Sequence, residues 1–176
     1  MKNRKDFALS PIGANAKLFF AGLILLSVIL IAVIWWKNPS EFSDIPLWAL
    51  GLMFGIGPAV LVAAAMGVRN PQAGLGMDGL SLKVSFIDKR WALNDIDRVN
   101  AALVNLESRQ ELRPKWKLWG AAMPGLSSGL FKLHNGERAH VYLTDKTNVV
   151  YLPTQKGVVL LSLERPGDFL DTLKGL

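Results

Sequence analysis

The chain has 176 residues, of which 51% are hydrophobic, and its mean hydropathy is +0.27. These values exceed those of an ordinary soluble domain, so a single soluble core is excluded for the part of the chain that carries the excess. Because the chain has no cysteine, disulfides, thiolate nucleophiles and cysteine-ligated metal centres are excluded as well. Twenty Lys and Arg against fourteen Asp and Glu give a net charge of +6, which permits an anionic partner.

Two uncharged segments predict a transmembrane helical hairpin over residues 18–68. The first, residues 18–36, has 19 residues between Lys17 and Lys37, and at about 1.5 Å per residue it matches the hydrocarbon thickness of a bilayer. The second, residues 46–68, has 23 residues and begins with a proline that suits a first helical turn. Uncharged runs of this length are rare outside membranes, so we expect two membrane-spanning helices.

The charges that flank these segments predict the orientation of the chain. Residues 1–17 hold four basic residues and one acidic residue, whereas the connector 37–45 holds one basic and two acidic residues. Residues 69–176 hold fifteen basic and eleven acidic residues. Because cytoplasmic flanks carry the excess of Lys and Arg, we expect both termini to be cytoplasmic and the connector to be outside.

Small residues on the second segment predict a face for close helix packing. Gly51 and Gly55 have the Gly-x-x-x-Gly spacing, and Gly57 and Ala63 follow them. The partner is either the first segment of the same chain, or another membrane protein or second copy. Neither segment contains an ionisable residue that would mark an ion path, so transport by this chain alone is not expected.

After a linker at residues 69–78, the composition predicts a mainly-β domain over residues 79–176. Alternation of apolar and polar residues predicts a first strand around Leu82 and Val84, a turn at Asp88-Lys89 and a second strand from Trp91. Residues 96–106 are read as a third, irregular strand. The charged stretch 107–117 is read as a loop or a frayed hairpin.

The clearest local signal is Asn135-Gly136, which lies between two alternating runs and is typical of a tight β-hairpin. Two further strands are expected at residues 149–152 and 158–163. A short helix is expected to begin near Pro166 and end at Gly175. This order predicts an antiparallel meander of about seven strands, a small barrel or sandwich with a C-terminal capping helix.

Several motifs follow one another through the second half of the chain: Trp119-Gly120, Met123-Pro124-Gly125, Gly129-Leu130-Phe131-Lys132-Leu133, Asn135-Gly136-Glu137, Val141-Tyr142-Leu143-Thr144-Asp145, Val149-Val150-Tyr151-Leu152-Pro153, Leu161-Ser162, Arg165-Pro166 and Phe169-Leu170. Together they resemble the bacterial pleckstrin-homology-like (PH-like) domains found in membrane proteins. The resemblance covers about the last 60 residues well. It implies a seven-stranded PH-like barrel with a C-terminal helix, and a platform for lipids, peptides or other subunits rather than an enzyme.

Catalytic chemistry has little support in the sequence, and we expect no catalytic residue, cofactor or metal site. The stretch around Ser127 formally matches the Gly-x-Ser-x-Gly nucleophile motif, so a hydrolase using Ser127 stays a remote alternative; the motif needs a strand before it and a helix after it. His134 and His140 are candidate cross-strand neighbours, but a metal site needs further ligands. A nucleic-acid partner is not expected.

Basic residues are the candidate contacts for lipid or for a partner protein. They are Lys2, Arg4, Lys5, Lys17, Arg69, Arg109, Arg113, Lys115 and Lys117. Those near the predicted spans lie within reach of anionic headgroups of the cytoplasmic leaflet, and those in the stretch 109–117 are interleaved with Trp116 and Trp119. The main hypothesis is an adaptor or accessory subunit in the bacterial cytoplasmic membrane, with another membrane protein or a second copy as partner. The alternative is a domain that binds anionic lipid.

Overall fold

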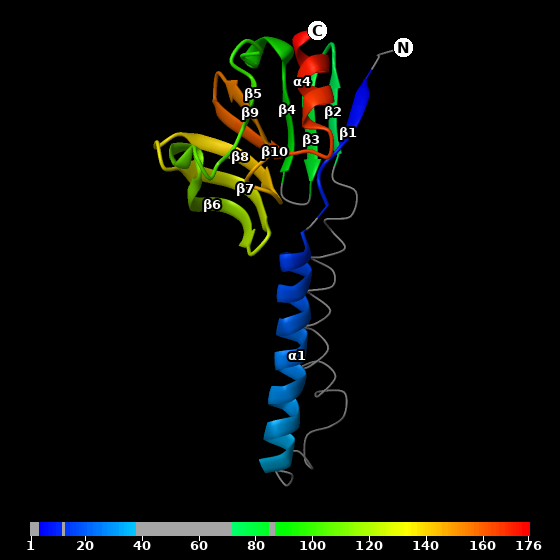
Figure 1. The fold of residues 1–176 in the computed structure, drawn as a ribbon, viewed down its shortest axis with the longest axis vertical. Coiled ribbons are helices and arrows are strands. Elements are labelled where there is room, and N and C mark those ends of the chain that lie inside the picture. Colours follow the sequence, from blue (N-terminus) through cyan, green and yellow to red (C-terminus); the bar gives the residue numbers. More distant parts are fainter. Residues whose placement is uncertain (1–3, 12, 38–71, 85–86) are drawn as a thin grey trace. The chain divides into compact units, whose positions relative to one another are not determined.

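The computed structural model describes residues 4–11, 13–37, 72–84 and 87–176 (Figure 1). The chain divides into two compact units. One joins Met1–Ala14 to Asn70–Leu176 and contains the described strands and the C-terminal helix; the other is Asn15–Arg69. The β-rich unit therefore includes residues from both sides of the apolar segments.

Helix α1 (Ala14–Lys37) covers the first predicted membrane span. Among the described residues, no helix meets the length and apolar character required to cross a membrane. The second predicted span, residues 46–68, lies outside the described residues. The same is true of its predicted packing residues Gly51, Gly55, Gly57 and Ala63. The transmembrane hairpin is therefore not found in the described part of the chain and stays a prediction.

The first sheet has the order β1-β2-β3-β4 and is antiparallel throughout. Its strands are β1 (Lys5–Ala8), β2 (Gln72–Gly76), β3 (Gly79–Val84) and β4 (Ile87–Trp91). Two predictions are corrected here. Strand β2 occupies half of the predicted linker 69–78; its glycines resemble a linker, but Ala73 and Leu75, which alternate with them, are buried. The predicted turn at Asp88-Lys89 lies inside β4, where both residues pair with β3.

The second sheet has the order β5-β9-β10-β8-β7-β6. Its strands are β5 (Ala102–Val104), β6 (Pro114–Met123), β7 (Leu126–Leu133), β8 (Arg138–Leu143), β9 (Val149–Thr154) and β10 (Gly157–Ser162). The predicted meander is wrong in two respects: β10 lies between β9 and β8 and runs parallel to β8, and β5 pairs with β9 rather than with β6. Alternation predicts which segments are strands but carries no information on which strands become neighbours.

Between β4 and β7, two predictions are only partly right, whereas the later ones are confirmed. The third strand is only the three residues of β5, preceded by the 3₁₀ turn η1 (Leu93–Asp95). The stretch 107–117, predicted as a loop or a frayed hairpin, contains the turn η2 (Gln110–Leu112) and then the first residues of β6, which forms a hairpin with β7. The β7–β8 hairpin is confirmed, with Gly136 at a φ of 90° that favours glycine. Strands β9 and β10 and helix α4 (Pro166–Lys174) are confirmed as well.

Both faces of the second sheet are buried over much of their area. One face carries a cluster of buried aliphatic and aromatic side chains that includes Phe131, Val141 and Leu160. On the opposite face, the rings of Trp91 in β4 and His140 in β8 make an edge-to-face contact with centroids 5.3 Å apart. The first sheet therefore packs on this second face, and the fold is a mainly-β domain with a C-terminal helix.

The N-terminal segment is part of this domain, although residues 1–17 were predicted to be a separate segment. The ring of Phe7 in β1 meets that of Phe169 in α4 edge to face, with centroids 5.1 Å apart. The Ser10 amide donates to the Ser162 carbonyl (2.9 Å), and the Tyr142 hydroxyl donates to the Ser10 carbonyl (3.3 Å). Burial raises the pKa of Tyr142 to about 12, so its hydroxyl remains a donor at neutral pH.

Removing the Phe7 ring is expected to destabilise the whole β-domain. Phe7 is buried between β1 and α4, so Phe7→Ala should lower the free energy of unfolding by about 3 kcal/mol. The exposed Met77→Ala variant serves as the matched control and should change it by less than about 0.5 kcal/mol. Chemical denaturation of the full-length chain measures both values. Equal effects of the two substitutions on the free energy of unfolding would show that β1 is not packed against α4.

Candidate functional site

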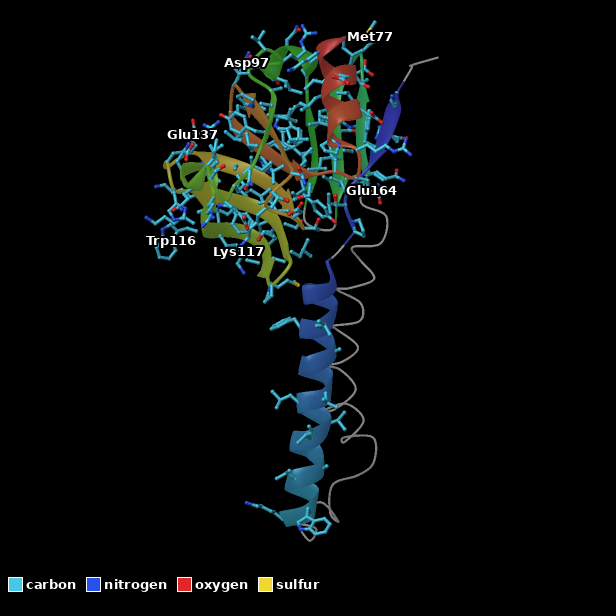
Figure 2. The ribbon with its side chains drawn as sticks, in the orientation of Figure 1. Met77, Asp97, Trp116, Lys117, Glu137 and Glu164 are labelled. Atoms are coloured by element: carbon cyan, nitrogen blue, oxygen red, sulfur yellow. The ribbon has the colours of Figure 1, made fainter. Side chains whose placement is uncertain are left out.

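Strand β6 is an exposed edge of the second sheet. It has ten residues, pairs with β7 on one side, and has no strand of the described residues on its other side. Trp116 and Trp119 are 64% and 68% exposed, and Leu118 between them is 49% exposed. Long apolar edge strands are sites for pairing with another chain, and native proteins usually shield them. This strand combines an open edge with large exposed side chains (Figure 2).

A bulge in β6 brings the two tryptophans to one face of the sheet. Residues three apart in a regular strand point to opposite faces. Here the register shifts just before Trp119, so Trp116 pairs with Lys132 while Trp119 pairs with Leu130. Lys132 and Leu130 are two residues apart on β7 and share a face, so both tryptophans lie on that face too.

Two basic residues complete this surface. Lys132 pairs with Trp116 on one side and with Arg138 of β8 on the other, and both basic side chains are exposed. Trp116, Trp119, Lys132 and Arg138 are referred to below as the aromatic-basic patch. Sequence reasoning missed Lys132 and Arg138, because their proximity to the tryptophans depends on strand register and on the bulge.

The predicted basic residues of the stretch 109–117 do not form one surface. Arg109 pairs with Glu111 (Nε to Oε1, 2.8 Å), a contact that lowers the pKa of the Glu111 carboxyl. Arg113 donates from Nε to the Leu106 carbonyl (2.6 Å), so it holds the loop around η2 in place rather than facing a ligand. Lys115 and Lys117 are exposed on β6, but Lys117 pairs with Phe131 and lies on the opposite face from Trp116.

The N-terminal basic residues are only partly described. Lys2 and Arg69 lie outside the described residues, and so does the side chain of Lys17 in α1. Arg4 donates from Nε to Asp6 (3.0 Å). The Lys5 ammonium lies 5.3 Å from the Phe7 ring centroid and 3.5 Å from the Thr172 hydroxyl, so its contacts are with this domain.

Ser127 lacks the context of an activated nucleophile. It is the second residue of β7, and the chain continues from β7 into the β8 hairpin rather than into a helix. Ser127 and His134 line one cavity of about 250 Å³, yet Nδ1 of His134 lies 3.1 Å from the Arg113 carbonyl. His134 and His140 are not cross-strand neighbours, since His140 pairs with Leu130. No three His, Asp or Glu side chains in the described residues gather as metal ligands.

The contact between Lys89 and His140 fixes the protonation state of the imidazole. The ammonium of Lys89 has only donors, so His140 Nε2 accepts (2.7 Å) and Nδ1 carries the proton. That Nδ1 is buried and has no hydrogen-bond partner among the described residues. Burial, with a smaller effect of the Lys89 charge, lowers the pKa of His140 to about 4.

The domain should therefore lose stability in mild acid. An unfolded histidine binds a proton below its ordinary pKa of about 6.5, whereas folded His140 resists protonation until about pH 4. Stability due to this group is complete above pH 6.5 and falls as the pH is lowered toward 4. NMR titration of the ring should give a midpoint near 4, and Lys89→Met should raise it. A midpoint near 6.5 would contradict the buried contact.

Comparison with known proteins agrees with this architecture. Residues 75–176 match the family described as bacterial PH domain. The match includes β3 to β10 and α4, whereas β1 and the first part of β2 lie outside it. The searches of curated proteins and of solved structures found no match. Since the family match extends over more than half of the chain, the protein belongs to the bacterial PH domain family.

Proposed function

We propose that this protein is a non-catalytic adaptor or accessory subunit, anchored in the bacterial cytoplasmic membrane and docked to another membrane protein through strand β6. The observation that carries the docking proposal is the open ten-residue edge of β6 with two exposed tryptophans on one face. Membership of the PH domain family supports a binding platform, because a fold of this kind supplies surfaces more often than reactive groups.

Membrane anchoring rests on the composition of the chain, since no helix in the described part qualifies as a membrane span. Residues 18–36 and 46–68 are free of charged residues, which is rare outside bilayers. Within α1, large apolar side chains such as Leu18, Leu25 and Val28 are more than half exposed. A row of exposed apolar side chains in water would be unfavourable, and contact with lipid or with another helix would bury it.

The pairing of β1 with β2 supports the proposed topology. Ala8 pairs with Gln72, so the two ends of the intervening segment lie side by side in one sheet. A sheet cannot be divided by a bilayer, and any segment that leaves and returns to it crosses the membrane an even number of times. Together with the excess of basic residues on both flanks, this pairing supports the proposal that the β-domain lies in the cytoplasm.

The absence of cysteine allows a direct test of this topology. Single cysteines are placed at Ser40, in the connector, and at Ser108, an exposed position of the β-domain. A membrane-impermeant maleimide added to intact spheroplasts should modify Ser40→Cys and leave Ser108→Cys unmodified until the cells are lysed. Modification of Ser108→Cys from outside would contradict the topology. Ser128 is unsuitable as a probe, because it is 2% exposed.

Docking through β6 combines backbone pairing with side-chain anchors. An extended segment of a partner added to the open edge would satisfy the backbone groups that β7 leaves unpaired. Trp116 and Trp119 supply the kind of large amphipathic side chain that is enriched at binding hot spots. Lys132 and Arg138 favour an acidic partner segment through charge complementarity.

Photo-crosslinking in intact cells tests this docking. A photoreactive amino acid replaces Leu118 on β6, and the exposed Met77 on the β2–β3 turn is the matched control position. Position 118 should give a discrete protein adduct that position 77 does not. Replacing both Trp116 and Trp119 by Ala should reduce the yield of this adduct, because aromatic anchors contribute about 2 kcal/mol or more each to binding. A lack of protein adducts at position 118, or equal adducts at both positions, would contradict the proposal.

The aromatic-basic patch favours one second candidate, the binding of anionic lipid. Tryptophan rings prefer the headgroup region of a bilayer, and Lys132 and Arg138 beside them would each gain about 1 kcal/mol from anionic headgroups. The same crosslinking experiment separates the two candidates. Adducts with phospholipid alone at position 118, lost when Lys132 and Arg138 are both replaced by Glu, would favour lipid binding over docking to a protein.

A further inference from the structure

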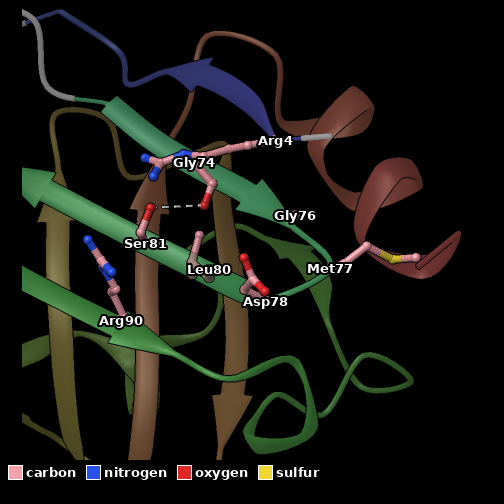
Figure 3. A pocket seen from close by; sticks show the side chains of 9 residues that line it. Arg4, Gly74, Gly76, Met77, Asp78, Leu80, Ser81 and Arg90 are labelled. Atoms are coloured by element: carbon pink, nitrogen blue, oxygen red, sulfur yellow. Dashed lines mark hydrogen bonds between the residues drawn. The ribbon is translucent and has the colours of Figure 1, made fainter. Parts of the chain in front are cut away.

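The outer face of the first sheet contains a groove of about 220 Å³ that is separate from β6 (Figure 3). Its floor is formed by Gly74 of β2 and Ser81 of β3, which pair with each other across the sheet. Arg4 lies along one side, and Arg90 of β4, the cross-strand neighbour of Ser81, lies along the other. The pairing of β2, β3 and β4 therefore brings the guanidinium groups of Arg4 and Arg90 to one small surface.

Arg4 occupies this place because residue 74 has no side chain. A Cβ atom at Gly74 would collide with Nε, Cζ and Nη2 of Arg4, so the guanidinium lies directly against the backbone of β2. Its Nε donates to Asp6 Oδ1 (3.0 Å), which orients the plane of the group. Within the described part of the chain, the hydrogen bond of the Arg4 side chain uses Nε alone, so its two terminal amino groups can donate to a ligand.

Arg90 and Ser81 are placed to share that ligand. No ion pair among the described residues involves Arg90, whose side chain is exposed beside the groove. The Ser81 hydroxyl lies between the two guanidinium groups and donates to the Gly74 carbonyl over 3.3 Å (Figure 3). That distance is long for a hydroxyl donor, so the hydroxyl is easily redirected to an oxygen of a ligand.

We propose that this groove binds a phosphate monoester dianion, held by the guanidinium groups of Arg4 and Arg90 and by the Ser81 hydroxyl. Guanidinium forks match the spacing of phosphate oxygens, and two forks on opposite sides suit a tetrahedral dianion. Asp78 lines the other end of the groove, at the β2–β3 turn, so the anion is expected at the Ser81 end. The site depends on Arg4, which lies outside the residues that match the family, and does not depend on docking through β6.

Binding to the full-length protein in neutral detergent is measured by titration calorimetry with glycerol 3-phosphate at pH 7.5. The expected result is one site per chain with a dissociation constant that Arg90→Gln weakens by about tenfold or more. The matched control is Lys83→Gln, which removes one exposed positive charge from the same face of β3 outside the groove and should change binding less than about twofold. Gly74→Ala should weaken binding as Arg90→Gln does, because it displaces Arg4 without altering any charge.

A second arm distinguishes the source of the phosphate. The full-length protein is reconstituted in nanodiscs of phosphatidylcholine with or without phosphatidic acid. Protection from a soluble maleimide is measured at Met77→Cys, an exposed position of the groove lining that supplies no ligand group, alone and combined with Arg90→Gln or Lys83→Gln. Binding of glycerol 3-phosphate in detergent identifies a soluble phosphate monoester, whereas protection of position 77 by phosphatidic acid that Arg90→Gln removes and Lys83→Gln leaves unchanged identifies a lipid headgroup. The proposal is overturned if neither glycerol 3-phosphate nor phosphatidic acid binds at the groove. It is also overturned if Lys83→Gln and Arg90→Gln weaken binding equally, since binding would then reflect only net charge.

Discussion

The pairing of β1 with β2 is the constraint on which the rest of this structure depends. A strand from the beginning of the chain completes the first sheet, while the family match begins only after the apolar segments. The bond from the Ser10 amide to Ser162 and the edge-to-face rings of Phe7 and Phe169 extend this pairing into the second sheet and α4. The apolar segments are thus an insertion into the β-domain rather than a leader before it.

This arrangement links the three proposed functional features of the chain. Because the two ends of the insertion pair within one sheet, both ends lie on the same side of any membrane that the insertion crosses. It also brings Arg4 onto the outer face of the first sheet, where Gly74 makes room for it. The second sheet keeps its own exposed surface at β6, so the groove and the proposed docking edge belong to different sheets.

Local signals in the sequence predicted the elements well where each element depends on its own residues. The Asn135-Gly136 hairpin, strands β9 and β10 and helix α4 follow from turn residues, alternation and capping, and the structure confirms them. Strand β6 was missed because charged residues beside proline resemble a loop, whereas an edge strand tolerates them. Strand β2 was missed because its glycines suggested a linker.

The candidate sites were harder to predict, because they depend on which strands become neighbours. Trp116 and Trp119 were recognised, but the bulge that puts them on one face with Lys132 and Arg138 has no signal in the sequence. The sequence suggested that Arg113 is a surface cation, but its guanidinium donates to the carbonyls of Leu106 and Glu107. Arg4 and Arg90 are 86 positions apart in the sequence, and only the order of the first sheet brings them together.

Hydrogen exchange at β1 in the full-length protein tests this account most directly. If β1 is a strand of the domain, a peptide covering residues 4–10 should exchange at least about a hundredfold more slowly than an unfolded chain, and in parallel with a peptide from β2. Exchange of residues 4–10 at the rate of an unfolded chain, while β2 and β3 remain protected, would show that the N-terminal strand is not part of the fold.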